Sequence, residues 1–436
     1  MRFFQIAIFT FLLQSSLFFL VTCLKGRSGQ TSALVGTKLY FFGGNSAIIN
    51  ATNEVWYLDL SNSSWFDTAM PTWYQDVGMP RGINMATSCV SLTNNSAIFL
   101  IGGRQFLPNS INISFYSPIF KFDFNNNSLW TIPNITNFNT TFKTRNLIQA
   151  VIDKKGKVFI FGGRSFPVND SDNSLTMYYN DMNIFDITTM SWSTLFIPQA
   201  PKSFSYTATL LPTGLIIYIG GVDYNISSGK SLVNLSEIRI FDTNNYIWST
   251  KTASGSFIGG RIGHTAVLDQ NGNIIIYGGS ISIDNIDGLP AFPHLAVLNT
   301  STWVWSIPDI SLSNTPNPLT FHSAAFYKNY MVIAFGRIPS SGGFFNKGVY
   351  VLDTQKYVWI GVNNPITTSQ GSPSSQTTQT NNTQKLSNSS SNNGMIIGIG
   401  VLCGFMVIGI ASLIGFLIFK RKRESHKSHK FQHMLS

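Results

Sequence analysis

Cysteine is scarce in this chain of 436 residues, which contains only Cys23, Cys89 and Cys403. Cys23 ends an apolar stretch at the N-terminus, and Cys403 lies in a second apolar stretch near the C-terminus. Because Cys89 is the only cysteine between the two stretches, that segment cannot form an intramolecular disulfide. It has to be held together by its apolar core, which roughly 330 residues can supply.

Charged residues are also few, at 11% of the chain. Between the two apolar stretches the only glutamates are Glu54 and Glu237, and the only histidines are His264, His294 and His322. This inventory contains no Ser/His/Asp set, phosphate-binding loop or cluster with metal-ligand spacing. We therefore predict that the chain is not an enzyme, with no catalytic residues, no metal site and no cofactor.

The N-terminal stretch has the pattern of a secretory signal peptide. Arg2 is followed by a mostly apolar run from Phe3 to Val21, and basic residues resume at Lys25. This pattern predicts a signal peptide over residues 1–23, cut after Cys23. Because the run is long for a signal peptide, an uncleaved signal anchor is the alternative.

The second apolar stretch, from Met395 to Phe419, carries no charge. At about 1.5 Å of rise per residue it predicts one transmembrane α-helix across a hydrocarbon core of about 30 Å. Lys420 to Arg423 follow at once, and an excess of Lys and Arg marks the cytosolic side. The sequence thus predicts a single-pass type I protein of the plasma membrane or the secretory pathway, with a basic cytosolic tail over residues 420–436.

The basic balance of the chain does not indicate a nucleic-acid partner. Lys and Arg outnumber Asp and Glu by 29 to 19, and six of the basic residues lie in the tail. We attribute the excess mainly to the membrane anchor and to attraction by anionic inner-leaflet lipid. Within the anchor, Gly400 and Gly404 form a small-residue motif on which two helices can pair, so a homodimer is one option.

The segment from residue 363 to residue 394 is rich in Ser, Thr, Asn, Gln and Pro, with Lys385 its only charge. It cannot bury apolar surface, which predicts a disordered and O-glycosylated stalk. All Asn-X-Ser/Thr sequons fall between the two apolar stretches, which predicts a glycosylated exterior. They are Asn50, Asn62, Asn94, Asn112, Asn126, Asn134, Asn139, Asn169, Asn225, Asn234, Asn299, Asn381 and Asn388.

A glycine pair at the end of an apolar, aromatic run recurs through the segment between the two stretches. The pairs end at Gly44, Gly103, Gly163, Gly221 and Gly279, and an incomplete sixth copy has the single glycine Gly336. Successive copies are 57 to 60 residues apart. Self-similarity at such a period is the signature of a repeat architecture.

Each repeat reads as four short strands. A first strand of small and apolar residues leads into a tight turn and the run that ends in the glycine pair. A third strand ends in an apolar residue followed by Asp or Asn, and a fourth strand opens with tryptophan. The six tryptophans expected there are Trp65, Trp130, Trp192, Trp248, Trp305 and Trp359. Four-stranded units cannot bury their faces alone, and closing six of them into a ring solves this.

These repeats resemble kelch repeats over residues 29–362. The resemblance implies an all-β, six-bladed kelch-type β-propeller, to which the sequence adds one transmembrane α-helix. The family also favours Arg-x-x-His before the first strand, which Arg261 and His264 keep whole. Arg81 and Arg145 keep only the arginine, and His322 keeps only the histidine.

Some proteins with kelch propellers are enzymes, but their residues are not recognisable here. Galactose oxidase and its relatives hold copper with Tyr, His and a Cys-crosslinked Tyr, whereas here His264 and His322 share one repeat position and indicate a structural, hydrogen-bonded role. Sialidase-like propellers need an arginine cluster with Tyr, Glu and Asp. Arg104, Arg164 and Arg337 follow the glycine pair at matching positions, but we interpret them as repeat-consensus residues.

The loops that follow the second strands are long, whereas the turns after the first and third strands are short. Long loops on one face of a rigid scaffold are where binding usually resides. The loops of repeats five and six contain no sequon, which predicts a glycan-free contact patch there. Its residues are Asp284, Asp287, Phe292, Arg337, Phe344 and Phe345.

Together these patterns predict a membrane-anchored glycoprotein whose propeller is an extracellular module that binds a protein or glycan ligand. One alternative is a divergent propeller oxidase or glycan-active enzyme, which a convergent Tyr, His and acidic cluster at the axis would indicate. The other is a structural or adhesive surface protein, which glycan binding would distinguish. The sequence names neither the ligand nor the organelle, and it leaves open a divergent seventh blade.

Overall fold

The computed structural model describes residues 24–47, 51–61, 71–91, 97–108, 110, 112–142, 145–165, 176–196, 200–284, 288–310 and 314–360. The chain divides into two units, Met1–Thr367 and Thr368–Ser436, and all described residues belong to the first. They form β-strands and one short 3-10 helix, η2 (Thr140–Phe142), with no α-helix. None of them belongs to a helix long and apolar enough to cross a membrane. The predicted signal peptide, stalk, membrane helix and tail lie outside the described residues.

Six four-stranded units follow one another along the chain, and we call them sheets one to six. In each sheet the four strands are antiparallel and adjacent in sequence order. First strands are β1 (Thr31–Val35), β6 (Thr87–Val90), β12 (Ala150–Ile152), β19 (Thr207–Leu210), β26 (Thr265–Leu268) and β30 (Ser323–Tyr327). Second strands are β2 (Lys38–Phe42), β7 (Ala97–Ile101), β13 (Lys157–Phe161), β20 (Leu215–Ile219), β27 (Asn273–Tyr277) and β31 (Tyr330–Ala334).

The outer half of each sheet completes the pattern. Third strands are β3 (Val55–Asp59), β9 (Ile119–Asp123), β16 (Met182–Asp186), β23 (Glu237–Asp242), β28 (Leu295–Asn299) and β32 (Val349–Asp353). Fourth strands are β4 (Trp73–Asp76), β10 (Leu129–Thr131), β17 (Ser191–Leu195), β24 (Ile247–Thr252), β29 (Val304–Ser306) and β33 (Val358–Ile360). The second strands are buried almost throughout, as continuous apolar runs predict for strands covered on both faces.

Short additional strands lie in the long loops or between a fourth strand and the next first strand, and the last of them pairs in parallel with β29 at the edge of sheet five. They are β5 (Gly82–Asn84), β8 (Arg104–Phe106), β11 (Arg145–Asn146), β14 (Arg164–Ser165), β15 (Met177–Tyr178), β18 (Lys202–Phe204), β21 (Val222–Asn225), β22 (Gly229–Leu232) and β25 (Ser254–Gly255). Most pair the residues just before a first strand with the loop after the following second strand, as β5 pairs with β8. The long loops are therefore tied to the entry of the first strands.

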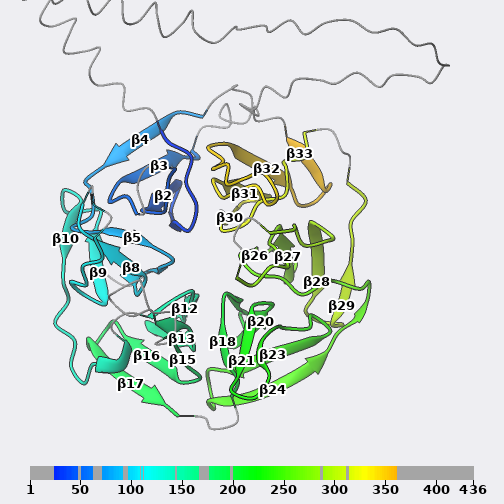
Figure 1. Ribbon diagram of the computed structural model, residues 1–436, viewed down its shortest axis with the longest axis horizontal. Helices are drawn as coiled ribbons and strands as arrows, with labels where there is room; N and C mark the ends of the chain where they lie inside the picture. The colour runs from blue at the N-terminus through cyan, green and yellow to red at the C-terminus, as the bar shows by residue number, and fades with distance from the viewer. Residues whose placement is uncertain are drawn as a thin grey trace, which may run out of the picture. The chain divides into compact units, whose positions relative to one another are not determined.

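The sheets lie side by side, with first strands innermost (Figure 1). The first strands of successive sheets contact each other, and β30 of sheet six also contacts β1 of sheet one. In Figure 1 the blue sheet one accordingly lies beside the yellow sheet six.

The fourth-strand tryptophans fill the spaces between sheets. Each stands opposite the apolar residue that precedes the third-strand Asp or Asn, as Trp130 stands opposite Phe122. The indole then packs against the second strand of the preceding sheet, as Trp248 packs against Phe161 at 4.6 Å between ring centroids. Such aromatic pairs contribute beyond the area they bury.

Sheet one departs from the predicted pattern. Its fourth strand opens at Trp73, which stands opposite Leu58, and not at Trp65, which lies outside the described residues. The prediction of Trp65 was therefore wrong. The connection between the third and fourth strands is longer here than in the other sheets, so the shortest spacing selected the wrong tryptophan.

The glycine pairs have the backbone conformation that their sequence predicts. Both members have positive φ in every pair, for example 70° at Gly278 and 96° at Gly279. In sheet six, Phe335 occupies the first position with a φ of 63° and is fully buried. Left-handed φ is unfavourable for a bulky residue, so packing around Phe335 must hold it.

Candidate functional site

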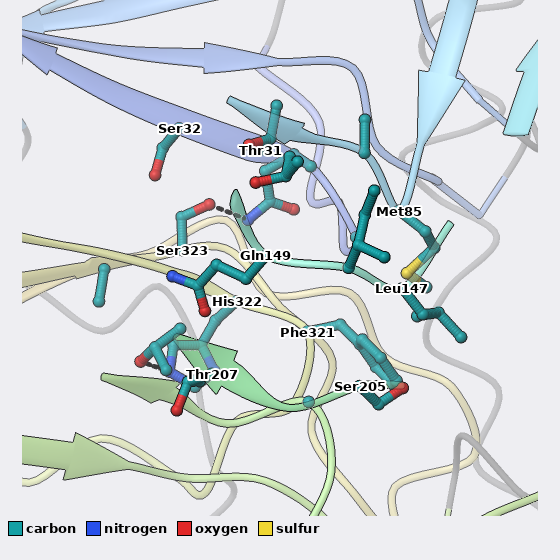
Figure 2. A pocket seen from close by; sticks show the side chains of 18 of the residues that line it. Thr31, Ser32, Met85, Leu147, Gln149, Ser205, Thr207, Phe321, His322 and Ser323 are labelled. Atoms are coloured by element: carbon teal, nitrogen blue, oxygen red, sulfur yellow. Dashed lines mark hydrogen bonds between the residues drawn. The ribbon is translucent and has the colours of Figure 1, made fainter. Parts of the chain in front are cut away.

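The six first strands begin around a cavity of about 200 Å³ (Figure 2). Every sheet contributes the same short segment to its wall, three or four residues around the first-strand entry. Strand entry and the glycine-pair loops lie at the same ends of the sheets, because the first two strands are antiparallel. The cavity is therefore on the side of the long loops.

Main-chain hydrogen bonds join the sheets around this cavity. The second glycine of each pair donates its N–H to a carbonyl of the next sheet, and sheet six donates to sheet one. The donor–acceptor pairs are Gly44–Ile83, Gly103–Arg145, Gly163–Ser203, Gly221–Arg261, Gly279–Leu319 and Gly336–Arg27, at 2.7 to 2.8 Å. A residue with a Cβ would collide with the neighbouring backbone at Gly43 or Gly102, which explains the glycines.

Two residues further along, a second set of equivalent residues lines the mouth of the cavity. They are Gly29, Met85, Leu147, Ser205, Gly263 and Phe321, and all have φ between 52° and 65°. Main-chain hydrogen bonds link them into a chain, such as Met85 N–H to Gly29 O at 2.8 Å and Gly29 N–H to Phe321 O at 2.9 Å. We call these six residues the mouth ring.

Side-chain hydrogen bonds cross every boundary between neighbouring sheets just inside the mouth ring. At two boundaries a hydroxyl meets a histidine: Thr207 Oγ1 lies 3.1 Å from His264 Nε2, and Thr265 Oγ1 lies 2.7 Å from His322 Nε2. The other four bonds run from Gln30 to Ser323, from Thr31 to Ser88, from the Ala150 N–H to Thr87 and from the Ala208 N–H to Gln149. Sheets six and one are thus bridged like any other pair.

The two histidines of this set are neutral at physiological pH. Burial lowers the pKa of His322 to about 3. Burial also lowers the pKa of His264 well below its ordinary value, with a smaller contribution from the charge of Arg261. A buried neutral imidazole that bonds a threonine of the adjacent sheet serves the structure, as predicted from its repeat position.

At three of the residues whose main-chain carbonyl accepts the glycine N–H, the side chain is a buried arginine. They are Arg27, Arg145 and Arg261. Arg145 pairs with Asp181 at 2.5 Å, and Arg27 pairs with Glu54 at 2.6 Å. Arg261 bonds main-chain carbonyls, including Pro293 O at 2.8 Å, and burial without a carboxylate lowers its pKa to about 10.

The sequence pattern assigned this position wrongly in two sheets. Arg81 was predicted to hold it, but Ile83 does, and Arg81 stacks on Tyr116 at 4.6 Å from the ring centroid. Arg27 was overlooked because its sheet has Gln30 where the motif expects histidine. Counting back three residues from that glutamine would have found it.

The arginines that follow the glycine pairs each lie over an aromatic ring. Arg104 lies over Phe106, Arg164 over Phe204 and Arg337 over Phe345, at 4.8 to 5.7 Å from the ring centroids. Among the described residues no three His, Cys, Asp or Glu side chains are placed to hold a metal ion. Cys89 is buried, and burial raises the pKa of its thiol to about 12.

The predicted contact patch is brought together in part. Arg337 and Phe345 pair across their loop, and Phe344 and Phe345 line a groove of about 510 Å³ with Lys25 and Lys347. Asp284 instead reaches Lys230 of sheet four at 2.5 Å. Asp287 lies outside the described residues.

Phe292 belongs to the loop of sheet five and is 74% exposed. Its ring contacts His294, and the adjacent Pro293 carbonyl accepts from the buried Arg261. Three further apolar side chains near this loop are exposed, namely Phe257, Ile281 and Leu289. The sequence pattern missed these three because single exposed apolar residues carry no periodic signal.

The sequons differ in their surroundings. Of those within the described residues, Asn112, Asn126, Asn134, Asn225 and Asn234 are exposed. Asn139 is half-buried, and its side-chain amide donates to Asn183 and Thr194. Asn299 is half-buried in the turn after β28, where its side chain accepts from Ser301 and Thr302. Asn50, Asn62, Asn94, Asn169, Asn381 and Asn388 lie outside the described residues.

Comparisons with known proteins identify the repeats. The KLHDC2/KLHL20/DRC7 Kelch-repeats domain matches residues 29–279 and 227–388. Acyl-CoA-binding domain-containing protein 5 of Arabidopsis thaliana is 24% identical over 75% of this chain and 46% of its own length. Kelch domain-containing protein 3 of Mus musculus is 27% identical over 50% of this chain and 56% of its own length. The chain thus spans about half the length of these relatives.

The family match extends over most of the chain and over all six sheets. Kelch repeats generally form β-propellers that act as protein-binding modules, and nothing in the comparisons shows an enzyme activity. This chain belongs to the kelch-repeat family.

Proposed function

We propose that the chain is a closed, six-bladed propeller that binds a protein partner outside the cell through the long loops of sheets five and six. The observation that carries this proposal is the groove beside Phe344 and Phe345, next to a loop that exposes Phe292 and Leu289. Exposed apolar side chains that gather on one face mark interaction sites. The side of the tight turns also has a groove, of about 790 Å³, but its lining is more polar and includes Asp153, Lys154 and Lys155.

The groove favours a particular kind of partner. Its wall is mainly apolar, and its charged residues are Lys25 and Lys347. A segment that inserts an aliphatic or aromatic side chain and flanks it with carboxylates would match both features. We therefore propose an acidic, apolar-anchored protein segment as the ligand.

The rest of the proposal concerns the setting of the propeller. Residues 1–23 are proposed as a cleaved signal peptide, 363–394 as a stalk, 395–419 as a single-pass membrane helix and 420–436 as a cytosolic tail. Exposed sequons such as Asn112 and Asn225 are proposed as glycan sites on sheets two and four. Homodimerisation through Gly400 and Gly404 belongs to the same proposal. Its support is the sequence pattern, in particular the charge-free span before Lys420.

Closure is supported by the contacts between sheets six and one. Phe335 packs against Trp73, Gln30 bonds Ser323, and Gly336 donates to Arg27 O. These are the same kinds of contact that join consecutive sheets.

The full-length chain expressed on cells tests the binding proposal. Proximity labelling or capture of surface proteins should identify a partner that Phe344→Ser combined with Lys347→Glu releases at least tenfold. The matched control is Ile247→Ser, which removes an exposed apolar side chain at the start of β24. A partner that both variants retain equally would overturn the assignment of this face.

A separate measurement tests the topology. Surface biotinylation and glycosidase treatment of intact cells should modify the repeat segment, and an antibody to residues 424–436 should require permeabilised cells. Reaction of that antibody with intact cells would contradict the proposed orientation.

A further inference from the structure

The cavity around which the six first strands begin, which we call the axial cavity, has polar but uncharged walls. Partner binding at the groove does not use them. The cavity walls contain no Asp, Glu, Lys or Arg among the described residues, and their two histidines are neutral. A charged ligand would lose its hydration there without gaining an opposite charge. The cavity therefore suits an uncharged ligand.

The walls nevertheless offer many hydrogen-bonding groups. The hydroxyls of Thr31, Ser88 and Thr265 belong to half-buried residues that line the cavity from sheets one, two and five. They are hydrogen-bonded within the wall and offer a ligand their remaining acceptor lone pairs. Figure 2 shows the Gln149 side chain extending into the cavity. Its oxygen accepts from the Ala208 N–H at 3.0 Å, so the amide NH₂ is the group available to a ligand.

Three sheets place large apolar side chains in the mouth ring, although the left-handed backbone conformation there is unfavourable for such residues. Gly29 and Gly263 show that glycine satisfies the left-handed conformation at this position. Met85, Leu147 and Phe321 hold the same conformation with large side chains, for which it is unfavourable. Strained residues of this kind cluster at ligand clamps. Figure 2 shows Phe321, Leu147 and Met85 together at one end of the cavity.

We infer that the axial cavity binds one neutral sugar ring. Its volume of about 200 Å³ corresponds to about seven water molecules at roughly 30 Å³ each, which is too small for a folded peptide segment. A sugar ring carries hydroxyls for Gln149 and the Thr and Ser hydroxyls, and apolar C–H faces for Phe321 at the mouth. Polar groups that fix the orientation of a ligand, beside an aromatic side chain that contacts it, are features of small-ligand sites. The ring is either a free sugar or the end of a glycan that enters from the long-loop side.

Titration of the purified full-length chain with uncharged sugars tests this inference. Saturation-transfer NMR and calorimetry with glucose, galactose, mannose and N-acetylglucosamine should find at least one saturable ligand. A dissociation constant on the order of 1 mM is expected for a ligand of this size. Glucuronate and sialic acid should bind at least tenfold more weakly. The free sugar and its methyl glycoside, followed by a glycan array, distinguish the two sources.

Gln149→Glu is the decisive variant because a carboxylate oxygen can still accept from the Ala208 N–H. The new side chain replaces the amide donor by a charged acceptor, so sugar affinity should fall at least tenfold. Gln270→Glu makes the same change at an exposed tight turn and should leave affinity unchanged. If Gln149→Glu fails to fold, Phe321→Gly, which keeps the favoured backbone, should produce the same loss.

Three results would overturn the inference. They are the absence of saturable binding by any of the neutral sugars at about 10 mM, an affinity that Gln149→Glu leaves unchanged, and a preference for the anionic sugars. Partner capture reports on the groove separately, because Phe344→Ser combined with Lys347→Glu should release the partner at least tenfold without changing sugar affinity.

Discussion

Two boundaries between sheets use the same contacts with different residues. Between sheets five and six, Trp359 packs on Tyr277 at 5.2 Å, and Thr265 bonds His322. Between sheets six and one, Trp73 packs on Phe335, also at 5.2 Å, and Gln30 bonds Ser323. The first boundary joins neighbours in sequence, whereas the second joins residues about 300 positions apart.

The difference shows how a repeat tolerates a lost consensus residue. Sheet six ends its second strand in the small Ala334, where sheet five has Tyr277. Phe335, at the next residue, supplies the missing aromatic ring and gives up the first glycine of the pair. At this boundary the left-handed backbone accommodates a Cβ, whereas at Gly43 and Gly102 a Cβ would collide with a carbonyl oxygen of the next sheet.

Truncation of Phe335 should have the largest effect on this comparison. Phe335→Ala removes a fully buried ring and should lower the free energy of unfolding by about 3 to 5 kcal/mol. Phe335→Gly should be less damaging than Phe335→Ala by about 1 kcal/mol, because glycine accepts positive φ. Urea unfolding of the purified chain measures both. Equal stability of the two variants would contradict the account of the backbone.

Acid should weaken the histidine boundary selectively. The pKa of His322 is about 3 in the folded chain and about 6.5 when unfolded, so the unfolded state binds more protons between these values. The free energy of unfolding should then fall by about 1.4 kcal/mol per pH unit below about pH 6.5 for each such histidine. His322→Gln introduces the side chain that Gln30 has at the equivalent position. It should remove the part of the pH dependence of the free energy of unfolding that His322 contributes.

The converse exchange sharpens the same comparison. Gln30→His should bring an acid-sensitive group to the boundary between sheets six and one, and it should steepen the loss of stability between pH 6.5 and pH 5. Denaturant titrations at several pH values give the slopes. An unchanged slope in both variants would mean that other groups govern the acid response.

Removal of single hydroxyls should have the smallest effect. Thr265→Val leaves His322 Nε2 without its partner and should destabilise by about 1 to 3 kcal/mol. Ser323→Ala should cost about 1 kcal/mol, since Gln30 Nε2 also lies 3.4 Å from Ala334 O. Thermal unfolding of the two variants in parallel gives the order, and a larger loss in Ser323→Ala would reverse it.

The sequence predicted the repeat and most strands because both depend on local patterns. The glycine pairs, the Asp-ended third strands and five of the six tryptophans recur at nearly constant spacing, and the strands follow them. The sixth tryptophan, Trp73, escaped because a longer connection displaced it from that spacing. Phe335 escaped because left-handed φ is not expected of phenylalanine.

The site was harder to predict because it depends on contacts between sheets. Gln149 and Thr31 look like ordinary strand residues, and only the fold brings them to one cavity. The long loops were visible in the sequence, and so were Phe344 and Phe345. The ion pair between Asp284 and Lys230 was not visible in the sequence, because no local pattern indicates which neighbouring loop a surface carboxylate will contact.

The mouth ring has an electrical consequence. Five of its main-chain N–H groups donate to the ring residue of the preceding sheet, as Met85 does to Gly29 and Phe321 to Gly263. Peptide dipoles arranged head to tail around a circle largely cancel, unlike those of a helix, which add along its axis. The dipoles of this ring therefore contribute little field along the axis, and they leave selection of a neutral ligand to shape and hydroxyl geometry.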